Sequence, residues 1–199
     1  MRFLLGLVIC LLSIESQAQF WIQKSSFAGV GRHRAVGCAT ENKGYLGLGH
    51  VNGSGVDYSY KDWWEYDPSS DSWSQKASFP VNNHGATSFV VNDHPCVGGG
   101  SALNGEFYEF NPVQNTWTPI AACPFFNPGD TQGFSVQNKG YVYSGNSFAE
   151  YDPTTNTWTM KAPVPIFMNS WSCSYGTNSS GFVKSGTNFY EYKPSHNEW

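Results

Sequence analysis

The sequence predicts an all-β fold made of four repeated units, each of four short antiparallel strands. One phrase recurs four times: an aromatic residue, a polar residue and a proline, with a tryptophan seven positions after the aromatic residue. No stretch has a convincing helical period, and glycine and proline recur too often for long helices. The phrase returns every 41 to 44 residues, which is the length of a solenoid, array or propeller unit, and four short strands per unit match a propeller blade.

The recurring phrase predicts a tight hairpin turn. Proline presets φ at the second turn position, an Asp or Asn before it bonds forward to the backbone, and an Asn or Asp three residues after it tolerates the left-handed region. The aromatic residue therefore ends the third strand of a unit, and the tryptophan opens the fourth. The four pairs are Tyr66 and Trp73, Phe110 and Trp117, Tyr151 and Trp158, and Tyr192 and Trp199.

A second phrase precedes the first in every unit. It is a tight polar turn followed by a short strand that ends in glycine, at Leu48-Gly49, Gly98-Gly99, Ser144-Gly145 and Ser185-Gly186. Each unit is therefore strand A, a turn, strand B, a variable loop, strand C, the hairpin and strand D. We expect the units at about residues 34–76, 84–120, 130–161 and 171–199, with residues 21–24 matching an additional strand D.

The two phrases together resemble the kelch repeat family. The resemblance rests on the glycine end of strand B, whole only at Gly98-Gly99, and on the aromatic residue and the tryptophan around the proline turn. It covers residues 21–199 and implies a β-propeller with four blades of four antiparallel strands. Kelch propellers close their ring when one terminus completes the blade of the other terminus.

The resemblance leaves two arrangements of the four blades open. In a four-bladed ring, residues 21–24 complete the fourth sheet. In an open arc, part of a longer or oligomeric propeller, sheet edges and an apolar blade face stay uncovered and allow self-association or additional blades. The arc is favoured because Trp199 stands where the last strand D begins.

Residues 1–18 are expected to be a signal peptide. Arg2 supplies a positive start, residues 3–12 form an apolar run, and Ser16-Gln17-Ala18 is a small-x-small cleavage site. The run is too short to span a membrane; an uncleaved anchor is the alternative. Cleavage after Ala18 would leave residues 19–199 as a secreted or periplasmic protein.

Four cysteines lie beyond this segment, and they match no CxxC metal spacing. Their positions differ from unit to unit, so we expect free, buried thiols that act as small apolar residues. Export would permit one disulfide among them. The four are Cys38, Cys96, Cys123 and Cys173.

Composition and motifs exclude several functional classes. The net charge is −4 at pH 7 and Lys and Arg do not cluster, so a nucleic-acid partner is not expected. No P-loop, nucleophile elbow, HExxH pair or dinucleotide fingerprint is present. We therefore expect no cofactor, no metal and no membrane span beyond the signal.

The variable loops form the predicted ligand-binding face. In a blade the D–A and B–C loops lie on one face and the uniform A–B and C–D turns on the other, and the first B–C loop carries a long insertion, residues 50–63. Rigid scaffolds place function on variable loops. The candidate ligand-binding residues are Arg32, His33, Arg34, His84, Asp130, Gln132, Asn169 and Trp171.

Four of these candidates are equivalent by register and are expected to ring the mouth of the channel: Arg34, His84, Asp130 and Trp171. Polar groups beside an aromatic ring suit a glycan or protein ligand. The alternative is that each polar side chain caps the backbone of its own loop.

Enzymatic chemistry remains an alternative to binding. His33, His50 and His84 could share the loop face, but no pair has the spacing of metal ligands. Among kelch-like enzymes, the copper site of galactose oxidase, with its tyrosines, histidines and Tyr–Cys crosslink, has no match here. Sialic acid mutarotases need acidic and basic groups near the propeller centre, for which Arg34 and Asp130 are candidates.

We therefore expect an exported binding or scaffolding module for a protein or glycan. A sugar-active enzyme and a purely structural role in a larger assembly are the alternatives. A glutamate precedes the strand C aromatic residue in every unit. We expect these glutamates to be structural, because a catalytic pair occurs once in a fold whereas these residues occur at the same position in each unit. We expect them to face solvent or to pair with Lys76 and Lys161; they are Glu65, Glu109, Glu150 and Glu191.

Overall fold

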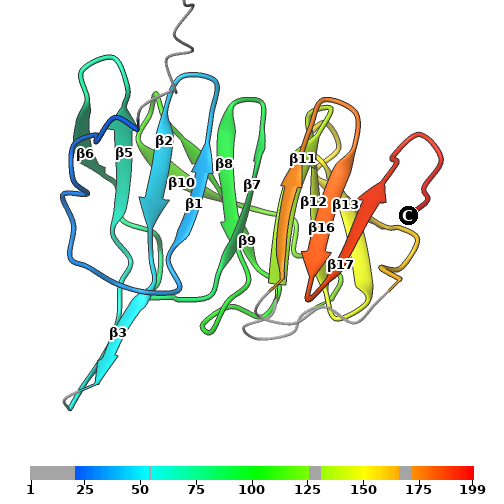
Figure 1. Cartoon of the computed structure of the whole chain (residues 1–199), viewed down its shortest axis with the longest axis horizontal. Helices are drawn as coiled ribbons and strands as arrows, with labels where there is room; N and C mark the ends of the chain where they lie inside the picture. Colours follow the sequence, from blue (N-terminus) through cyan, green and yellow to red (C-terminus); the bar gives the residue numbers. More distant parts are fainter. Residues whose placement is uncertain (1–20, 54, 126–130, 166–171) are drawn as a thin grey trace, which may run out of the picture.

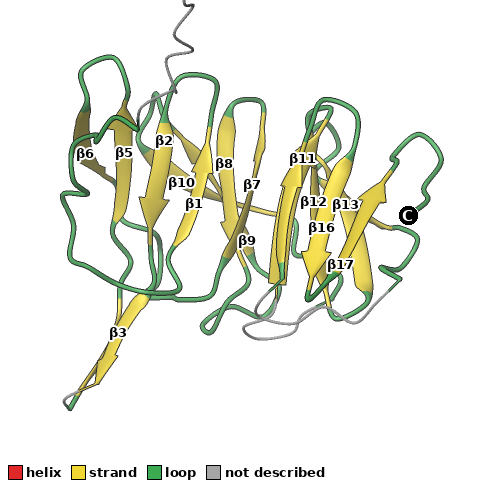
Figure 2. Cartoon of the chain, viewed as in Figure 1, coloured by secondary structure: helices red, strands yellow, loops and turns green. Residues whose placement is uncertain are grey.

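The computed structural model describes residues 21–53, 55–125, 131–165 and 172–199, and the regular structure in these ranges is strand and turn without helix (Figure 2). Four antiparallel sheets follow one another along the chain. The first contains β1 (Val36–Ala39), β2 (Gly44–Gly47), β5 (Trp63–Asp67) and β6 (Ser72–Lys76). The second contains β7 (Thr87–Val91), β8 (His94–Gly98), β9 (Phe107–Asn111) and β10 (Thr116–Ile120).

The third and fourth sheets differ by one strand. The third contains β11 (Thr131–Val136), β12 (Lys139–Ser144), β13 (Ser147–Asp152) and β14 (Thr157–Met160). The fourth has only β15 (Cys173–Gly176), β16 (Gly181–Ser185) and β17 (Asn188–Tyr192). A separate hairpin of β3 (His50–Gly53) and β4 (Val56–Ser59) is inserted between β2 and β5.

The four sheets are arranged as the blades of a β-propeller, which confirms the predicted fold class (Figure 1). Their inner strands lie side by side in the order β1, β7, β11 and β15. In the described part of the chain, no contact of similar extent joins β15 back to β1, so the blades form an open arc.

The closed-ring alternative is wrong for this structure, and so is the predicted strand at residues 21–24. These residues adopt no strand conformation and are exposed, and the fourth sheet keeps three strands. The chain instead meets blade 1: Ser25 bonds to Asp71, and Phe27 packs edge-on against Trp73. These contacts place residues 25–27 against blade 1 rather than beside blade 4.

A pair of hydrogen bonds, here called the inter-blade clamp, joins each blade to the segment before it. The indole N–H of the repeated tryptophan donates to a backbone carbonyl, and the side chain of the turn Asp or Asn accepts the N–H of the same residue. In blade 3, Trp158 donates to Ala121 at 2.8 Å and Asn156 accepts from it at 2.8 Å. The residues clamped in blades 1, 2 and 4 are Ser25, Ala77 and Ala162.

The turn phrase supplies the geometry that the clamp requires. Its Asp or Asn adopts a left-handed φ of 48° to 54°, which these two residue types tolerate. In three blades the strand C tyrosine also donates its hydroxyl to the same side chain, as Tyr151 does to Asn156 at 3.0 Å. The phrase therefore connects blades as well as forming the hairpin predicted from sequence.

The tryptophan rings fill the space between neighbouring blades. Trp158 of blade 3 packs against Phe89 and Phe107 of blade 2, with ring centroids 5.8 and 5.4 Å apart. Trp117 meets Trp63 of blade 1 at 5.3 Å in the same way. The buried aromatic clusters accordingly combine residues of two successive blades, and burial of such rings is the main source of propeller stability.

The repeated glutamates are structural, as predicted. Glu65 pairs with Lys76 at 3.0 Å, and Glu150 pairs with Lys161 at 3.1 Å. Glu109 contacts His94, and Glu191 accepts a hydrogen bond from Ser180. Each carboxylate thus serves its own blade.

The described cysteines are all free thiols. Cys96 and Cys123 are buried as expected, and burial raises the pKa of the Cys123 thiol to about 11. The expectation of burial is wrong for Cys173, which is exposed on β15, and Cys38 is partly exposed. Cys38 lies on β1 and Cys173 on β15, both inner strands.

We predict that Asn156→Gly lowers the free energy of unfolding by about 1–3 kcal/mol, because the Ala121 N–H and the Tyr151 hydroxyl lose their acceptor. Glycine tolerates the left-handed φ, so backbone strain does not contribute. Urea denaturation measures the change. Thr155→Ala, at an exposed position of the same turn, should cost no more than about 0.5 kcal/mol; equal losses in the two variants would contradict the clamp's role.

Candidate functional site

The loop face carries the inserted β3–β4 hairpin, which extends away from the blades at the lower left of Figure 1. Three backbone hydrogen bonds join the base of the insertion to the rest of the protein. Gly49 N–H donates to Asn83 O at 2.9 Å, Tyr60 N–H to Gly49 O at 2.8 Å, and Asn83 N–H to Tyr60 O at 3.0 Å. The insertion of blade 1 is thereby joined to the D–A loop that leads into blade 2.

Three histidines meet at this junction, and we call them the histidine cluster: His33, His50 and His84. The first two exchange backbone hydrogen bonds, and their Nε2 atoms lie 2.9 Å apart. The rings of His50 and His84 have centroids 4.1 Å apart. His84 Nδ1 contacts the hydroxyls of Ser59 at 2.9 Å and Ser101 at 3.1 Å.

A buried amide organises the loop beneath this cluster. Asn83 is fully buried, and its Nδ2 donates to Gly99 O at 2.8 Å. Its Oδ1 accepts from the N–H groups of His84 at 2.9 Å and Ala102 at 3.1 Å, and from the Ser101 hydroxyl at 3.2 Å. Asn83 is therefore a loop cap, and it fixes where His84 stands.

The surroundings of His50 and His84 lower the pKa of both side chains and favour their neutral forms. Burial lowers the pKa of His50, and the neighbouring His33 and Arg34 lower it further, while Asp57 opposes them. Burial, His50 and Arg34 lower the pKa of His84 in the same way. His50 is only 5% exposed, and its Nδ1 atom has no hydrogen-bond partner among the described residues.

Arg34 stands beside the cluster with a free side chain. It is exposed, adopts a left-handed φ of 51°, and accepts a backbone hydrogen bond from Gly85 at 3.0 Å. No described residue forms a hydrogen bond or ion pair with its guanidinium. Its guanidinium thus has no partner within residues 21–53, 55–125, 131–165 and 172–199.

Arg32, a second predicted ligand residue, serves the fold instead. Its side chain is 3% exposed and forms a bidentate pair with Asp62, with one N–O distance of 2.9 Å. It also donates to Leu48 O and Val30 O and lies 4.0 Å from the centre of the Tyr60 ring. Burial raises the pKa of Asp62, but hydrogen bonds from Arg32 and Trp64 outweigh it and lower the pKa overall.

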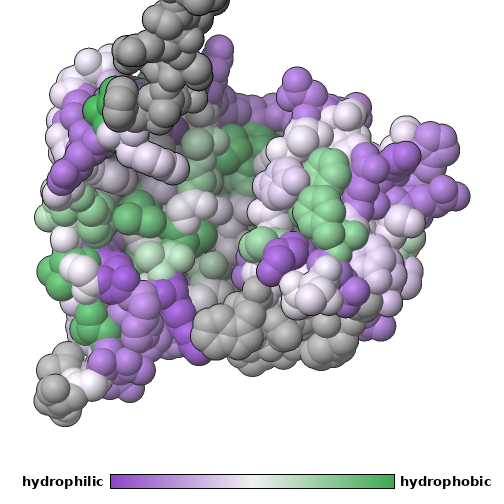
Figure 3. All heavy atoms as spheres, in the orientation of Figure 1, coloured by the Kyte–Doolittle hydropathy of each residue, from purple (hydrophilic) through white to green (hydrophobic). Residues whose placement is uncertain are grey.

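A groove runs along the concave side of the arc, where the inner strands lie, and Figure 3 shows this hollowed face. Two adjoining cavities of about 210 and 420 Å³ are lined by β1, β7, β11 and β15. Ser88 donates to Gly37 O and Ser174 donates to Gly133 O, each at 3.0 Å. A Cβ at Gly133 would lie 3.0 Å from Ser88 O, so glycine lets the inner strands approach.

The predicted site residues fall into three groups. His33, Arg34 and His84 gather at the histidine cluster, and Gln132 lines the smaller cavity beside Ala35 and Ala86. Arg32 is buried in its loop. Three predicted residues lie outside the described residues: Asp130, Asn169 and Trp171.

The sequence analysis grouped His50 with His33 and His84 on the loop face but did not include it among the candidate ligand-binding residues. It did not identify Ser59 and Ser101, which contact His84. The long insertion was the available signal, since it contains His50 and Ser59. Their proximity to His84 depends on backbone bonds between two blades, and no spacing in the sequence encodes those bonds.

Within the described ranges, no group of three or more His, Cys, Asp or Glu side chains is arranged to hold a metal ion. In the histidine cluster, the nearest Nε2 atoms of His33 and His50 are directed at each other. The same ranges contain no helix that is long and apolar enough to cross a membrane.

The solved structure of YjhT is similar to this chain, with a TM-score of 0.72 and 18% sequence identity. The chain has the fold of a β-propeller. The match covers 85% of this chain and 63% of the YjhT chain, so this chain spans less than two thirds of that structure's length. No family model and no curated protein matches the sequence.

We predict that the free energy of unfolding falls as the pH drops below about 6.5, the pKa of histidine in an unfolded chain. His50 and His84 resist protonation in the folded state, so the unfolded state binds more protons in this range. His50→Gln should reduce this slope in urea titrations between about pH 7 and 5.5. His196→Gln, which removes an exposed histidine, is the control. Equal reductions of the slope in the two variants would contradict the assignment of the pH dependence to the histidine cluster.

Proposed function

We propose that this protein is a carbohydrate-binding module for sugars that carry a carboxylate. The observation that supports the proposal is the guanidinium of Arg34, which has no partner among the described residues. It lies beside the histidine cluster, and the next residue, Ala35, lines the smaller cavity. An arginine fork matches the two oxygens of a carboxylate and forms charge-assisted hydrogen bonds with them. In a protein of net charge −4, an arginine at the variable loops provides positive charge for an anion.

The remaining groups suit the rest of a sugar. Imidazole nitrogens donate to or accept from hydroxyls according to their tautomer, and His33 is exposed beside Arg34. Gln132 adds a planar amide at the smaller cavity. Protonation of the cluster at lower pH would add positive charge, so affinity for an acidic sugar should rise as the pH falls.

A sugar-active enzyme is the second candidate. His33 and His50 share an Nε2···Nε2 contact of 2.9 Å, and the lowered pKa of His50 keeps it neutral near pH 7. A neutral histidine in contact with a second one suits proton transfer to and from a sugar hydroxyl. NMR of the sugars used in the calorimetry below would measure the rate at which their anomers exchange. A faster exchange in the presence of the protein distinguishes catalysis from binding alone.

Two further assignments belong to this proposal. The chain is a kelch-type propeller segment, supported by the fourfold return of the aromatic residue, proline turn and tryptophan in the inter-blade clamp. It is also exported, supported by the charged start, apolar run and small-x-small end of residues 1–18.

Export predicts a mature chain that begins at Gln19. Intact-mass measurement of protein expressed from residues 1–199 and recovered outside the cytoplasm should give the mass of residues 19–199. A chain that keeps residues 1–18 and stays in the membrane fraction would support the uncleaved-anchor alternative and contradict cleavage.

Titration calorimetry with glucuronic acid and N-acetylneuraminic acid tests the binding proposal, with glucose as the neutral comparison. We predict binding of an acidic sugar, and a loss of about tenfold or more in affinity for Arg34→Ala, as expected for removal of a bidentate charge-assisted pair. Lys184→Ala, which removes an exposed lysine of β16, should bind as the parent does. Equal affinity for glucose, or an unchanged Arg34→Ala variant, would overturn the proposal.

A further inference from the structure

The β3–β4 hairpin has two chemically different faces. In an antiparallel pair, residues directly opposite each other lie on the same face, and successive residues of a strand alternate between faces. His50 lies opposite Ser59 and Asn52 lies opposite Asp57, so these four residues share one face, which is polar. Tyr58 lies on the other face.

Contacts on both faces stabilise the base of the hairpin. Tyr58 packs edge-on against Tyr60 with ring centroids 5.0 Å apart, and the guanidinium of Arg32 lies 4.0 Å from the centre of the Tyr60 ring. On the polar face, the ring of His50 contacts the other two members of the histidine cluster. A two-stranded hairpin alone is marginally stable in water. These contacts therefore position the hairpin, and its polar face continues outward from the histidine cluster.

Asn52 and Asp57 form the outer part of this polar face. Both are exposed, and no described residue forms a hydrogen bond or ion pair with either side chain. Two residues along a strand span about 7 Å, so this pair lies farther out than His50 and Ser59 by a distance comparable with one sugar unit. The amide of Asn52 donates and accepts hydrogen bonds, and the carboxylate of Asp57 accepts them, which suits the hydroxyls of a sugar.

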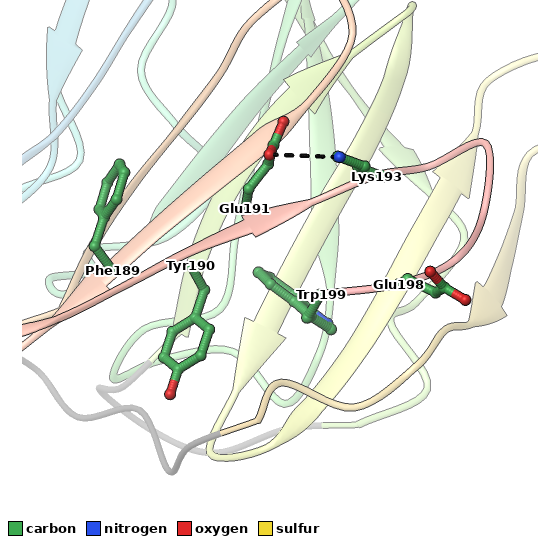
Figure 4. A pocket seen from close by; sticks show the side chains of 6 residues that line it. All are labelled: Phe189, Tyr190, Glu191, Lys193, Glu198 and Trp199. Carbon is green, nitrogen blue, oxygen red and sulfur yellow. Dashed lines mark ion pairs between the residues drawn. The ribbon is translucent and has the colours of Figure 1, made fainter.

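The charges near the histidine cluster have opposite signs. Burial lowers the pKa of two of its histidines most strongly; Arg34 lowers it further, and Asp57 opposes this. Arg34 and Asp57 form no ion pair with each other or with another described residue. The cavity of about 290 Å³ in blade 4 differs, because its Glu191 and Lys193 lie 3.9 Å apart and compensate each other (Figure 4). An uncompensated cation and anion favour a ligand whose charge is unevenly distributed.

We propose that the carbohydrate site has a second subsite at Asn52 and Asp57, and that it takes an oligosaccharide in which an acidic sugar is joined to an uncharged one. The acidic unit occupies the Arg34 site of the proposed function, on which this subsite depends. The uncharged unit donates hydroxyl hydrogens to Asp57 and exchanges hydrogen bonds with Asn52. A carboxylate on this second unit would meet the carboxylate of Asp57, and like charges repel. A glycan with a carboxylate on every unit is therefore disfavoured.

Titration calorimetry of the full chain with glucuronic acid, and with the disaccharide of glucuronic acid and N-acetylglucosamine, tests the second subsite. We expect the disaccharide to bind about fivefold more tightly than glucuronic acid, the gain that one or two additional hydrogen bonds provide. Digalacturonic acid carries a carboxylate on both units and should bind no more tightly than galacturonic acid.

Asn52→Ala should remove this gain, so that the mixed disaccharide binds the variant no more tightly than glucuronic acid does. Asn178→Ala is the matched control, because it removes an exposed asparagine from the A–B turn of blade 4, and it should keep the gain. Circular dichroism of each variant checks that the fold is retained.

Asp57→Asn keeps a planar polar side chain and removes its charge. It should raise the affinity for digalacturonic acid about threefold or more above that of the parent. Glu41→Gln removes the same charge from the exposed A–B turn of blade 1, on the opposite face, and should leave this affinity as it is. Equal increases in the two variants would show an effect of net charge alone and would overturn the selection by Asp57.

The measurements separate the subsite from the function on which it depends. If glucuronic acid binds and the mixed disaccharide binds no more tightly, the second subsite is wrong while the Arg34 site stands. Retention of the gain in Asn52→Ala would also overturn the subsite. Failure of every one of these saccharides to bind would overturn both the subsite and the proposed function.

Discussion

The inter-blade clamp is the interaction on which the rest of the structure depends. A tryptophan indole and a turn Asp or Asn together satisfy the N–H and C=O of one residue in the preceding segment, and this occurs at Ser25, Ala77, Ala121 and Ala162. Buried backbone groups need partners, and the clamp supplies them where one blade passes to the next. The same tryptophan rings also fill the space between blades, as Trp158 does against Phe89 and Phe107.

A scaffold joined in this regular way leaves the opposite face free to vary. The A–B and C–D turns repeat because each must bond to its neighbour, whereas the B–C loops differ in length and one carries the β3–β4 hairpin. The histidine cluster forms on that variable face, where Asn83 ties the insertion of blade 1 to blade 2. Regular bonding on one side of the propeller thus permits the loops on the other side to vary.

The same repetition explains how neighbouring blades share their core. A blade buries its aromatic face where another blade packs on it, as Tyr141 and Phe148 of blade 3 pack against Tyr192 of blade 4. The tryptophan and the turn Asp or Asn of the next blade then bond to the residue that follows strand D, as at Ala77 and Ala121.

The sequence by itself determined most of the strands, the four units, the place of each tryptophan after its turn and the structural role of the glutamates. These depend on local turn chemistry and on a repeat that places equal residues in equal environments. The sequence favoured the arc and allowed three histidines to share the loop face, but tertiary structure decided between arc and ring and brought the histidine rings into contact. Tertiary structure alone separated Arg32, which is buried against Asp62, from Arg34, which has no side-chain partner among the described residues. The physical reason is that these outcomes depend on contacts between different blades and loops, where the sequence no longer repeats and spacing carries no distance information.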